Sequence, residues 1–307
     1  MTRIITVTFS PCIDKNTTVP ILVPEKKMHC TELKSEPGGG GINVARVLNI
    51  LGGDVTAIFP SGGCSGVHLN QLLYKEKVPF IPIQCQSETR ENFAIFEEST
   101  KKQFRFGMPG NELLKNEWLE CLKVIENEKN VDFIVASGSL PLGVPLNIYG
   151  QLSKIAKKND AKFIVDTSGD ALKEAVDEGV YLLKPNLEEL GFLVGIDNLK
   201  IEGVEDAAKE LIHKNQCEII VTSLGEKGAI LVTKQKTLHI KPPKIIVKST
   251  IGAGDSMVAG IVFGLSNGEN LEKSLHYGIA CGTAATMNLG SQLCKKKDVE
   301  MLLKILK

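Results

Sequence analysis

Short apolar runs alternate with amphipathic stretches along most of the chain. The runs rich in β-branched residues predict strands at 4–9, 55–60, 132–138, 162–169, 180–186 and 218–225. Apolar residues at helical spacing predict helices at 42–51, 66–77, 146–158, 170–178, 187–194, 204–214, 254–266 and 271–289. Buried strands that alternate with helices are typical of an α/β protein with a mostly parallel sheet and helices on both faces.

Two segments, 11–36 and 80–108, do not fit this alternation. They carry short strand-like runs, such as 93–98 and 102–108, with polar residues and prolines between them. The expected architecture is therefore one α/β domain over 1–307, with these segments paired into a small β-sheet lid over the edge of the main sheet.

The composition excludes some function classes and leaves others open. In 307 residues, 36 Lys and Arg balance 36 Asp and Glu, and aromatic residues make up only 5%. This balance argues against a protein that binds nucleic acid over its whole surface. The eight cysteines form no CxxC pair, and no apolar run is long enough for a membrane span, so we expect buried reduced thiols and a cytoplasmic protein.

The stretch 250–256, TIGAGDS, places an acid directly after a glycine turn that opens a helix. The first N–H groups of a helix have no partner within the helix and lie at its positive end, so they form an anion hole. Asp255 beside such a hole suits a base that removes a hydroxyl proton during phosphoryl transfer. Alternatively, Asp255 is only a helix-starting acid.

The stretch 37–46, PGGGGINVAR, is a second glycine turn that enters a helix. Its bare backbone allows a ligand to approach closely, and the carboxamide of Asn43 can bind sugar hydroxyls. The turn lacks the ending of a Walker A loop. Asp14, just past the first strand, can hold two neighbouring hydroxyls. The alternatives are a tightly packed turn and a solvated Asp.

Two further strand ends carry candidate residues. Lys184 and Asn186 end the strand at 180–186, and Glu189 follows in the next helix, at the sheet edge where α/β proteins bind ligands. An Asn and a Glu suit Mg²⁺ through water. A helix cap is the alternative. Ser223 and Gly225 end the next strand, at 218–225, and Gly228 follows it. Small residues there leave room for a ring or phosphates, or simply form a hairpin approach.

In this order, the stretches TVTFSPCIDK, GGGGINVAR, SGSLP, DTSG, KPNLEEL, TSLGEKGA and TIGAGDSMVAG resemble the PfkB carbohydrate kinase family over essentially the whole chain. The resemblance implies a ribokinase-like three-layer α/β/α sandwich. The sequence is most similar to the minor 6-phosphofructokinase branch, because Gly40 stands where related hexose-phosphate kinases often have Lys.

The resemblance implies phosphorylation of fructose 6-phosphate at its C1 hydroxyl, with ATP and Mg²⁺, and it points to K⁺ as a further ion. Asp255 would be the base, and Gly252, Ala253 and Gly254 the anion hole. Asp14, Gly39, Asn43 and Ser139 would hold the sugar, and Lys27 and Arg90 its phosphate. Lys184, Asn186, Ser223, Gly225 and Gly228 would line the ATP site, Glu189 the Mg²⁺ waters, and Ser249, Ile251, Ala285, Asn288 and Gly290 the monovalent cation.

The chain departs from the branch at His29 and Gln292, where Arg is expected. Exposed lid edges and the apolar residues Phe93, Ile95, Phe104 and Phe106 suggest a homodimer joined through the lids. Tagatose 6-phosphate, fructose 1-phosphate and an unphosphorylated sugar remain alternative substrates. A non-catalytic sugar- or nucleotide-binding protein would not need Asp255, and an NAD-dependent dehydrogenase would need a different first turn.

Overall fold

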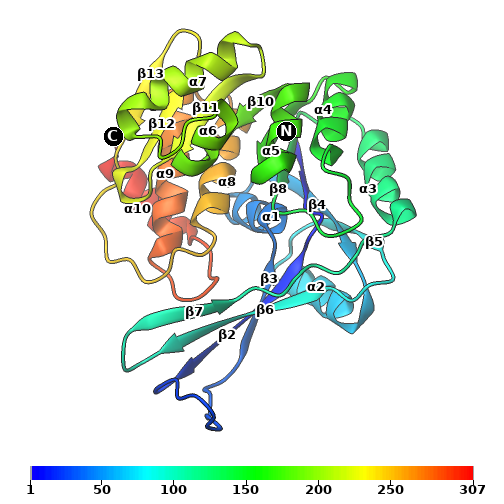
Figure 1. Ribbon diagram of the computed structural model, residues 1–307, viewed down its shortest axis with the longest axis vertical. Helices are drawn as coiled ribbons and strands as arrows, with labels where there is room; N and C mark the ends of the chain where they lie inside the picture. The colour runs from blue at the N-terminus through cyan, green and yellow to red at the C-terminus, as the bar shows by residue number, and fades with distance from the viewer. Residues whose placement is uncertain (1, 307) are drawn as a thin grey trace.

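The computed structural model describes residues 2–306 and divides their strands between two sheets (Figure 1). The larger sheet has nine strands in the order β13-β12-β11-β10-β9-β8-β1-β4-β5. From β5 to β11, neighbouring strands of this sheet pair in parallel. The last two strands, β12 and β13, form a hairpin, and β12 pairs antiparallel with β11. Its strands are β1 (Arg3–Val7), β4 (Asp54–Ser61), β5 (Phe80–Gln84), β8 (Phe133–Ser137), β9 (Lys162–Asp166), β10 (Val180–Leu183), β11 (Cys217–Ser223), β12 (Ala229–Val232) and β13 (Thr237–Ile240).

Helices cover both faces of this main sheet, which gives three layers. On one face lie α1 (Gly40–Leu51), α2 (Gly63–Lys75), α8 (Ala253–Ser266), α9 (Leu271–Thr286) and α10 (Lys296–Ile305). On the other lie α3 (Lys115–Asn127), α4 (Ile148–Lys158), α5 (Gly169–Glu178), α6 (Leu187–Val194) and α7 (Val204–His213). Single 3₁₀ turns occur at Ile201–Gly203 and Gly225–Lys227.

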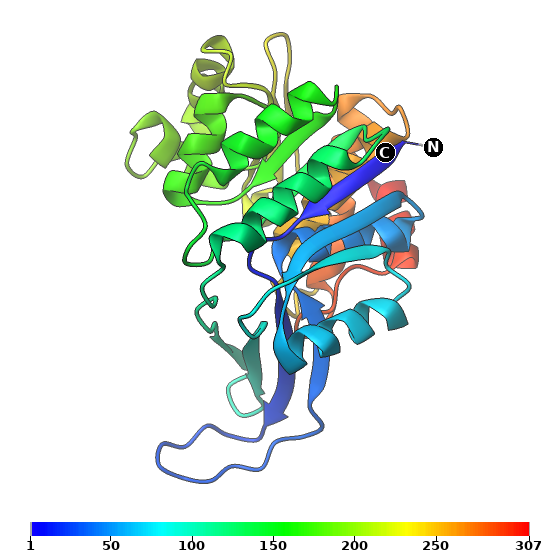
Figure 2. The same cartoon turned by 90° about the vertical axis from the view of Figure 1, so that its right-hand side faces the viewer.

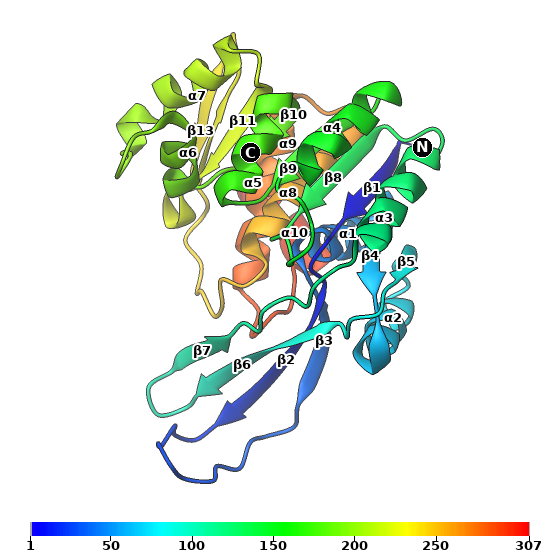
Figure 3. The same ribbon diagram turned by 45° about the vertical axis from the view of Figure 1, so that its right-hand side comes forward.

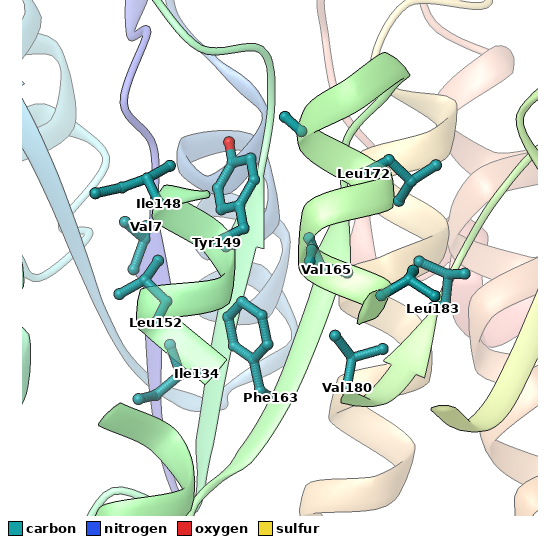
Figure 4. Packing of buried hydrophobic residues seen from close by; sticks show 14 of the residues in the cluster. Val7, Ile134, Ile148, Tyr149, Leu152, Phe163, Val165, Leu172, Val180 and Leu183 are labelled. Carbon is teal, nitrogen blue, oxygen red and sulfur yellow. The ribbon is translucent and has the colours of Figure 1, made fainter. Parts of the chain in front are cut away.

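The central strands are apolar on both sides because both sides are buried. In β8, Phe133 and Val135 pack toward α1 and α8, while Ile134 and Ala136 pack toward α4. Figure 4 shows Ile134 between Leu152 of α4 and the neighbouring strands. Full burial of such a side chain contributes about 1.5–3 kcal/mol, so these layers give the strand ends a rigid base.

The four remaining strands form a small sheet that stands away from the layers (Figures 1 and 3). Its order is β3-β2-β6-β7, from β3 (Lys34–Gly38), β2 (Cys12–Val19), β6 (Arg90–Glu97) and β7 (Lys102–Phe106). The chain passes from β1 into β2 through residues 8–11, and from β3 almost directly into α1. Figure 2 shows the loop 20–33 at the far end of this small sheet.

The predicted α/β fold and the predicted strands and helices are confirmed, with three differences. Residues 80–84, expected in the lid, form β5, which pairs with β4 at the edge of the main sheet. Helices α3 and α10 were not predicted. The expectation that all thiols are buried is wrong for Cys30 and Cys64, which are exposed, although all eight cysteines are free.

Along residues 2–306, no helix combines the length and apolarity that crossing a bilayer requires.

Candidate active site

A cleft of about 520 Å³ lies between the small sheet and the carboxyl ends of the central strands. Both parts of the molecule line it: Asp14, Arg90 and Arg105 from the small sheet, and Asn43 and Asp255 from the helices. Two larger cavities, of about 590 Å³ each, lie beside α2 and near the amino ends of β9 to β11. Neither contains a residue predicted for the site, so the cleft is the candidate active site.

Asp255 lies in the first turn of α8, as predicted. Gly252 begins the helix with φ of 70°, a left-handed conformation that favours glycine. The N–H of Ala253 points back to the carbonyl of Thr250 at 3.4 Å. Within residues 2–306, the N–H groups of Gly252 and Gly254 have no acceptor. This turn therefore offers unpaired amides beside a carboxylate, the arrangement of an anion hole.

Two donors hold the carboxylate of Asp255. Asn43 Nδ2 donates to Oδ2 at 2.9 Å, and Ser137 Oγ donates to Oδ1 at 3.4 Å. Burial raises the pKa of Asp255 to about 6, and the nearby charge of Asp166 adds to this, while Asn43, Lys184 and Ser137 oppose it. A carboxylate with this pKa is ionised at neutral pH and still basic enough to accept a hydroxyl proton.

Lys184 lies directly behind the glycine turn. Its Nζ pairs with Asp166 Oδ1 at 3.1 Å, and a Cβ added at Gly254 would lie 3.7 Å from Nζ. Burial alone would lower the pKa of Lys184, but the charge and hydrogen bond of Asp166 outweigh it and raise that pKa. Lys184 is therefore a fixed positive charge beside the anion hole.

Asn186 and Glu189 cap the start of α6. Asn186 Oδ1 accepts from the N–H of Glu189, and Glu189 Oε2 accepts from the N–H of Asn186, each at 2.8 Å. The helix-cap alternative thus describes their main contacts. Burial raises the pKa of Glu189, and the charge of Asp166 contributes to the same shift, so these two carboxylates lie near each other. Neither is part of the cleft lining.

The predicted residues after β11 lie beside this cap. Ser223 bridges to Asn186, and its N–H donates to the carbonyl of Pro185 at 2.9 Å. Gly225 and Gly228 have φ of 60° and 89°, and a Cβ at Gly228 would overlap the carbonyl of Ile240. The backbone conformation favours glycine at both positions, and close packing requires it at Gly228, whereas a Cβ at Gly225 would meet open space.

The four consecutive glycines are packed against neighbouring strands. A Cβ at Gly38 would lie 2.5 Å from Asp14 Oδ2, one at Gly40 would overlap Ser137 Oγ, and one at Gly41 would overlap the carbonyl of Val7. Only Gly39, with φ of 110°, and Gly40 line the cleft. The loop is therefore both the tightly packed turn and the bare backbone that the sequence left as alternatives.

The predicted sugar and phosphate residues are only partly brought together. Asp14 lines the cleft, and its Oδ1 accepts from Asn92 Nδ2 at 3.1 Å. Arg90 donates to the carbonyls of Met108 and Ser10 at 3.0 and 3.2 Å, which fixes its guanidinium at the cleft wall. Ser139 is exposed and outside the cleft lining.

Lys27 and His29 are exposed residues of the loop 20–33, which lies at the far end of the small sheet (Figure 2). Neither lines the cleft within a single chain. Gln292 lies outside it as well, in a neighbouring cavity of about 460 Å³ under the small sheet.

The residues expected at a monovalent-cation site do gather. Ser249 Oγ donates to the carbonyl of Gly290 at 2.7 Å, and the N–H of Asn288 donates to the carbonyl of Ala285 at 3.1 Å. The N–H of Ile251 donates to Ser249 Oγ at 3.3 Å. This oxygen-rich loop also contacts the small sheet.

Four residues that contact the site were not predicted: Ser137, Asp166, Asn92 and Arg105. The first two are the last residues of β8 and β9. A polar residue that ends a buried parallel strand is itself a signal, because ligands bind at that edge. Arg105 lies between Phe104 and Phe106 in β7, and successive side chains of a strand point to opposite faces. This alternation is the sequence signal that sets Arg105 on a different face from its neighbours.

A buried carboxylate beside unpaired amides, on a three-layer α/β fold with a flanking small sheet, is the arrangement expected of a phosphotransferase that acts on a hydroxyl group. Residues 7–298 match the model of the pfkB family carbohydrate kinases. The chain belongs to this family.

Relatives match almost end to end. The chain is 40% identical over 303 residues to ATP-dependent 6-phosphofructokinase isozyme 2 of Escherichia coli, covering 98% of both chains. It is 41% identical over 299 residues to the protein of that name from Mycobacterium tuberculosis, covering 97% of this chain and 88% of the relative. A 1-phosphofructokinase of Borreliella burgdorferi is 32% identical over 305 residues, covering 98% and 96%.

Solved structures agree with this. The crystal structure of phosphofructokinase-2 from Escherichia coli in complex with fructose-6-phosphate has a TM-score of 0.94 at 39% identity, covering 100% of this chain and 99% of that one. The structure of the Escherichia coli enzyme in complex with potassium has a TM-score of 0.95 at 40% identity, covering 100% and 99%.

Proposed function

We propose that this chain is an ATP-dependent 6-phosphofructokinase. The C1 hydroxyl oxygen of fructose 6-phosphate attacks the γ-phosphorus of ATP, the bond from that phosphorus to the β–γ bridging oxygen breaks, and ADP leaves. Asp255 takes the hydroxyl proton, and the amides of Gly252, Ala253 and Gly254 stabilise the charge on the transferred group. The observation that carries the proposal is Asp255, held by Asn43 at 2.9 Å beside these amides and facing the cleft.

The small sheet would bind the phosphorylated sugar. Asp14, Gly39 and Asn43 would hold its hydroxyls. Arg90 and Arg105 are guanidinium groups in the cleft lining and suit its phosphate. Lys27 would join them only if its loop folded inward or if it came from a second copy.

ATP would lie along the ends of β10 and β11, beside Lys184, Asn186, Ser223, Gly225 and Gly228. Lys184 would neutralise phosphate charge. Glu189 and Asp166 fit a Mg²⁺ ion held through water. Burial and then the nearby charge of Asp166 raise the pKa of Glu189, and a divalent cation would relieve the repulsion between the two carboxylates. Bound Mg²⁺ would neutralise charge on the triphosphate.

The loop of Ser249, Ile251, Ala285, Asn288 and Gly290 fits K⁺. The hydroxyl of Ser249 and the carbonyl of Gly290 already lie within hydrogen-bond distance. Both would offer neutral oxygens as ligands to the ion. The ion would stabilise the conformation of the turn that precedes Gly252.

We also propose a homodimer joined through the small sheets, in a reducing cytoplasm. β3 and β7 are open edges, and Phe104 is 38% exposed. All eight cysteines are free thiols, which supports a reducing compartment, because disulfides are rare there. A tetrameric inhibited form is described for the Escherichia coli phosphofructokinase-2, so sedimentation should be measured with and without ATP.

The test of the function is a side-by-side comparison of kcat/KM for fructose 6-phosphate, tagatose 6-phosphate, fructose 1-phosphate and fructose. We expect fructose 6-phosphate to lead. A higher value for tagatose 6-phosphate or fructose 1-phosphate would assign the chain to a tagatose-6-phosphate kinase or 1-phosphofructokinase. Absence of transfer to every acceptor would overturn the kinase proposal.

A further inference from the structure

A buried arginine lies behind the amide that holds the catalytic carboxylate. Arg46, on α1, is only 6% exposed and is not part of the cleft lining. Its Nε and Nη2 bind the two carboxylate oxygens of Glu76 at 2.6 and 2.7 Å. Its Nη1 donates to the carbonyl of Pro37 at 2.8 Å. Arg46 is thus fixed by the end of α2 and by the end of β3.

The same Nη1 also reaches Asn43, three residues earlier on the same face of α1. It donates to Asn43 Oδ1 at 3.4 Å, the longest contact of this guanidinium. The other end of that carboxamide, Nδ2, donates to Asp255 at 2.9 Å. Turning the carboxamide over would set Nδ2 against the guanidinium donor and Oδ1 against the carboxylate, and both contacts would be repulsive.

We propose that Arg46 is a positioning residue for phosphoryl transfer, which holds the Asn43 carboxamide so that it donates to Asp255. This inference rests on the proposed kinase function. Two bonds to Glu76 hold the planar guanidinium in place, so the orientation of Asn43 is set before substrate arrives. If Arg46 only tied α1 to α2, its loss would lower stability and leave the chemistry of Asp255 unchanged.

Arg46→Met should lower kcat about 10- to 100-fold, because a displaced group at the reacting centre costs about that much. It should also move the acid limb of kcat/KM to higher pH, because the hydrogen bond from Asn43 lowers the pKa of Asp255. The other groups that face Asp255 are Ser137, Asp166, Lys184 and Cys12. All of them remain in the variant. Loss of the Arg46 charge would move the limb in the same direction, so Arg46→Lys, which keeps the charge but not the three contacts, is measured beside it.

A double-mutant cycle tests whether Arg46 acts through Asn43. In an Asn43→Ala background, Arg46→Met should lower kcat by less than about threefold. Arg3→Met is the matched control, because Arg3 also pairs with a glutamate, Glu128, and donates to a backbone carbonyl, at the opposite end of β1. It should lose stability without a shift of the acid limb.

The outcomes separate the two proposals. A wild-type protein without kinase activity would overturn the proposed function. An active wild type in which Arg46→Met keeps both kcat and the acid limb, or adds its full effect to Asn43→Ala, would overturn the positioning role. If Arg46→Met does not fold, Arg46→Lys replaces it: a lysine cannot span Glu76, Pro37 and Asn43 at once, so the same upward shift is expected.

Discussion

The main sheet and the small sheet of this chain differ in what covers them. Ile134 in β8 and Ile164 in β9 are 0% exposed between two layers of helices. In the small sheet, Arg105 lines the cleft, while its neighbour Phe104 is 38% exposed. The main body therefore holds its reacting groups on a complete core. The small sheet lines the cleft with Asp14, Arg90 and Arg105, and within residues 2–306 no layer of helices covers it; the proposed dimer would cover part of its exposed surface.

The largest effect is expected in the main body, from Asp255→Asn. This change removes the proton acceptor and nearly preserves the shape, so kcat should fall about 10²- to 10⁴-fold. ATP binding, measured by calorimetry, should remain. Near-normal turnover would show that the base lies elsewhere.

The next largest effect is a difference between the two sheets in the free energy of unfolding that a substitution costs. Ile134→Ala removes fully buried methyl groups and should cost about 2–5 kcal/mol in urea unfolding. Phe104→Ala should cost the main body far less, and should instead weaken self-association in sedimentation experiments. Equal losses of unfolding free energy, with assembly unchanged, would contradict the difference between the sheets.

The small sheet should determine substrate affinity. Arg105→Met removes a charge-assisted contact worth about 1.5–3 kcal/mol, so KM for fructose 6-phosphate should rise roughly 10- to 100-fold. KM for ATP should hardly change. The exposed Lys102 on the same strand provides the control, because it lies outside the cleft lining. A fall in kcat alone would place Arg105 with the reacting groups.

The smallest expected effect is a pH dependence that belongs to the main body. The pKa of Asp255 is raised to about 6, so the base becomes protonated as the pH falls below that value. On this limb kcat/KM should fall tenfold per pH unit. The free energy of unfolding should change with pH in the opposite direction to the activity. Because the folded state binds the Asp255 proton more tightly, it is favoured at low pH, and this contribution is lost as the pH rises from about 4 to 6.

Patterns within a strand or a helix predicted most of this fold. The β-branched run before Ser137 and the glycines around α1 each indicated an element without reference to the rest of the chain. α3 was missed although Trp118, Cys121, Leu122 and Ile125 have helical spacing. β5 was assigned to the wrong sheet because pairing partners are set by tertiary packing, which local alternation does not contain.

The site was predictable where motifs carry chemistry. Asp255, Asn43 and Asp14 line one cleft as expected. Ser139 was named from the resemblance as a sugar contact, and in this chain it is exposed and outside the cleft lining. Ser137, which donates to Asp255, was not named, because the sequence cannot say which of two neighbouring serines points inward. Lys27 was assigned from the resemblance alone, and in one chain its loop lies away from the cleft.

The close fit of Gly40 has a consequence for how this protein can vary. A single added methyl group at Gly40 would push against the hydroxyl of Ser137, which is itself a hydrogen-bond donor to Asp255. A stretch without side chains would ordinarily be the easiest place for mutations to accumulate. Here the opposite holds, because Gly40 leaves no room for a side chain. A substitution at Gly40 is expected to disturb the hydrogen bond from Ser137 to Asp255.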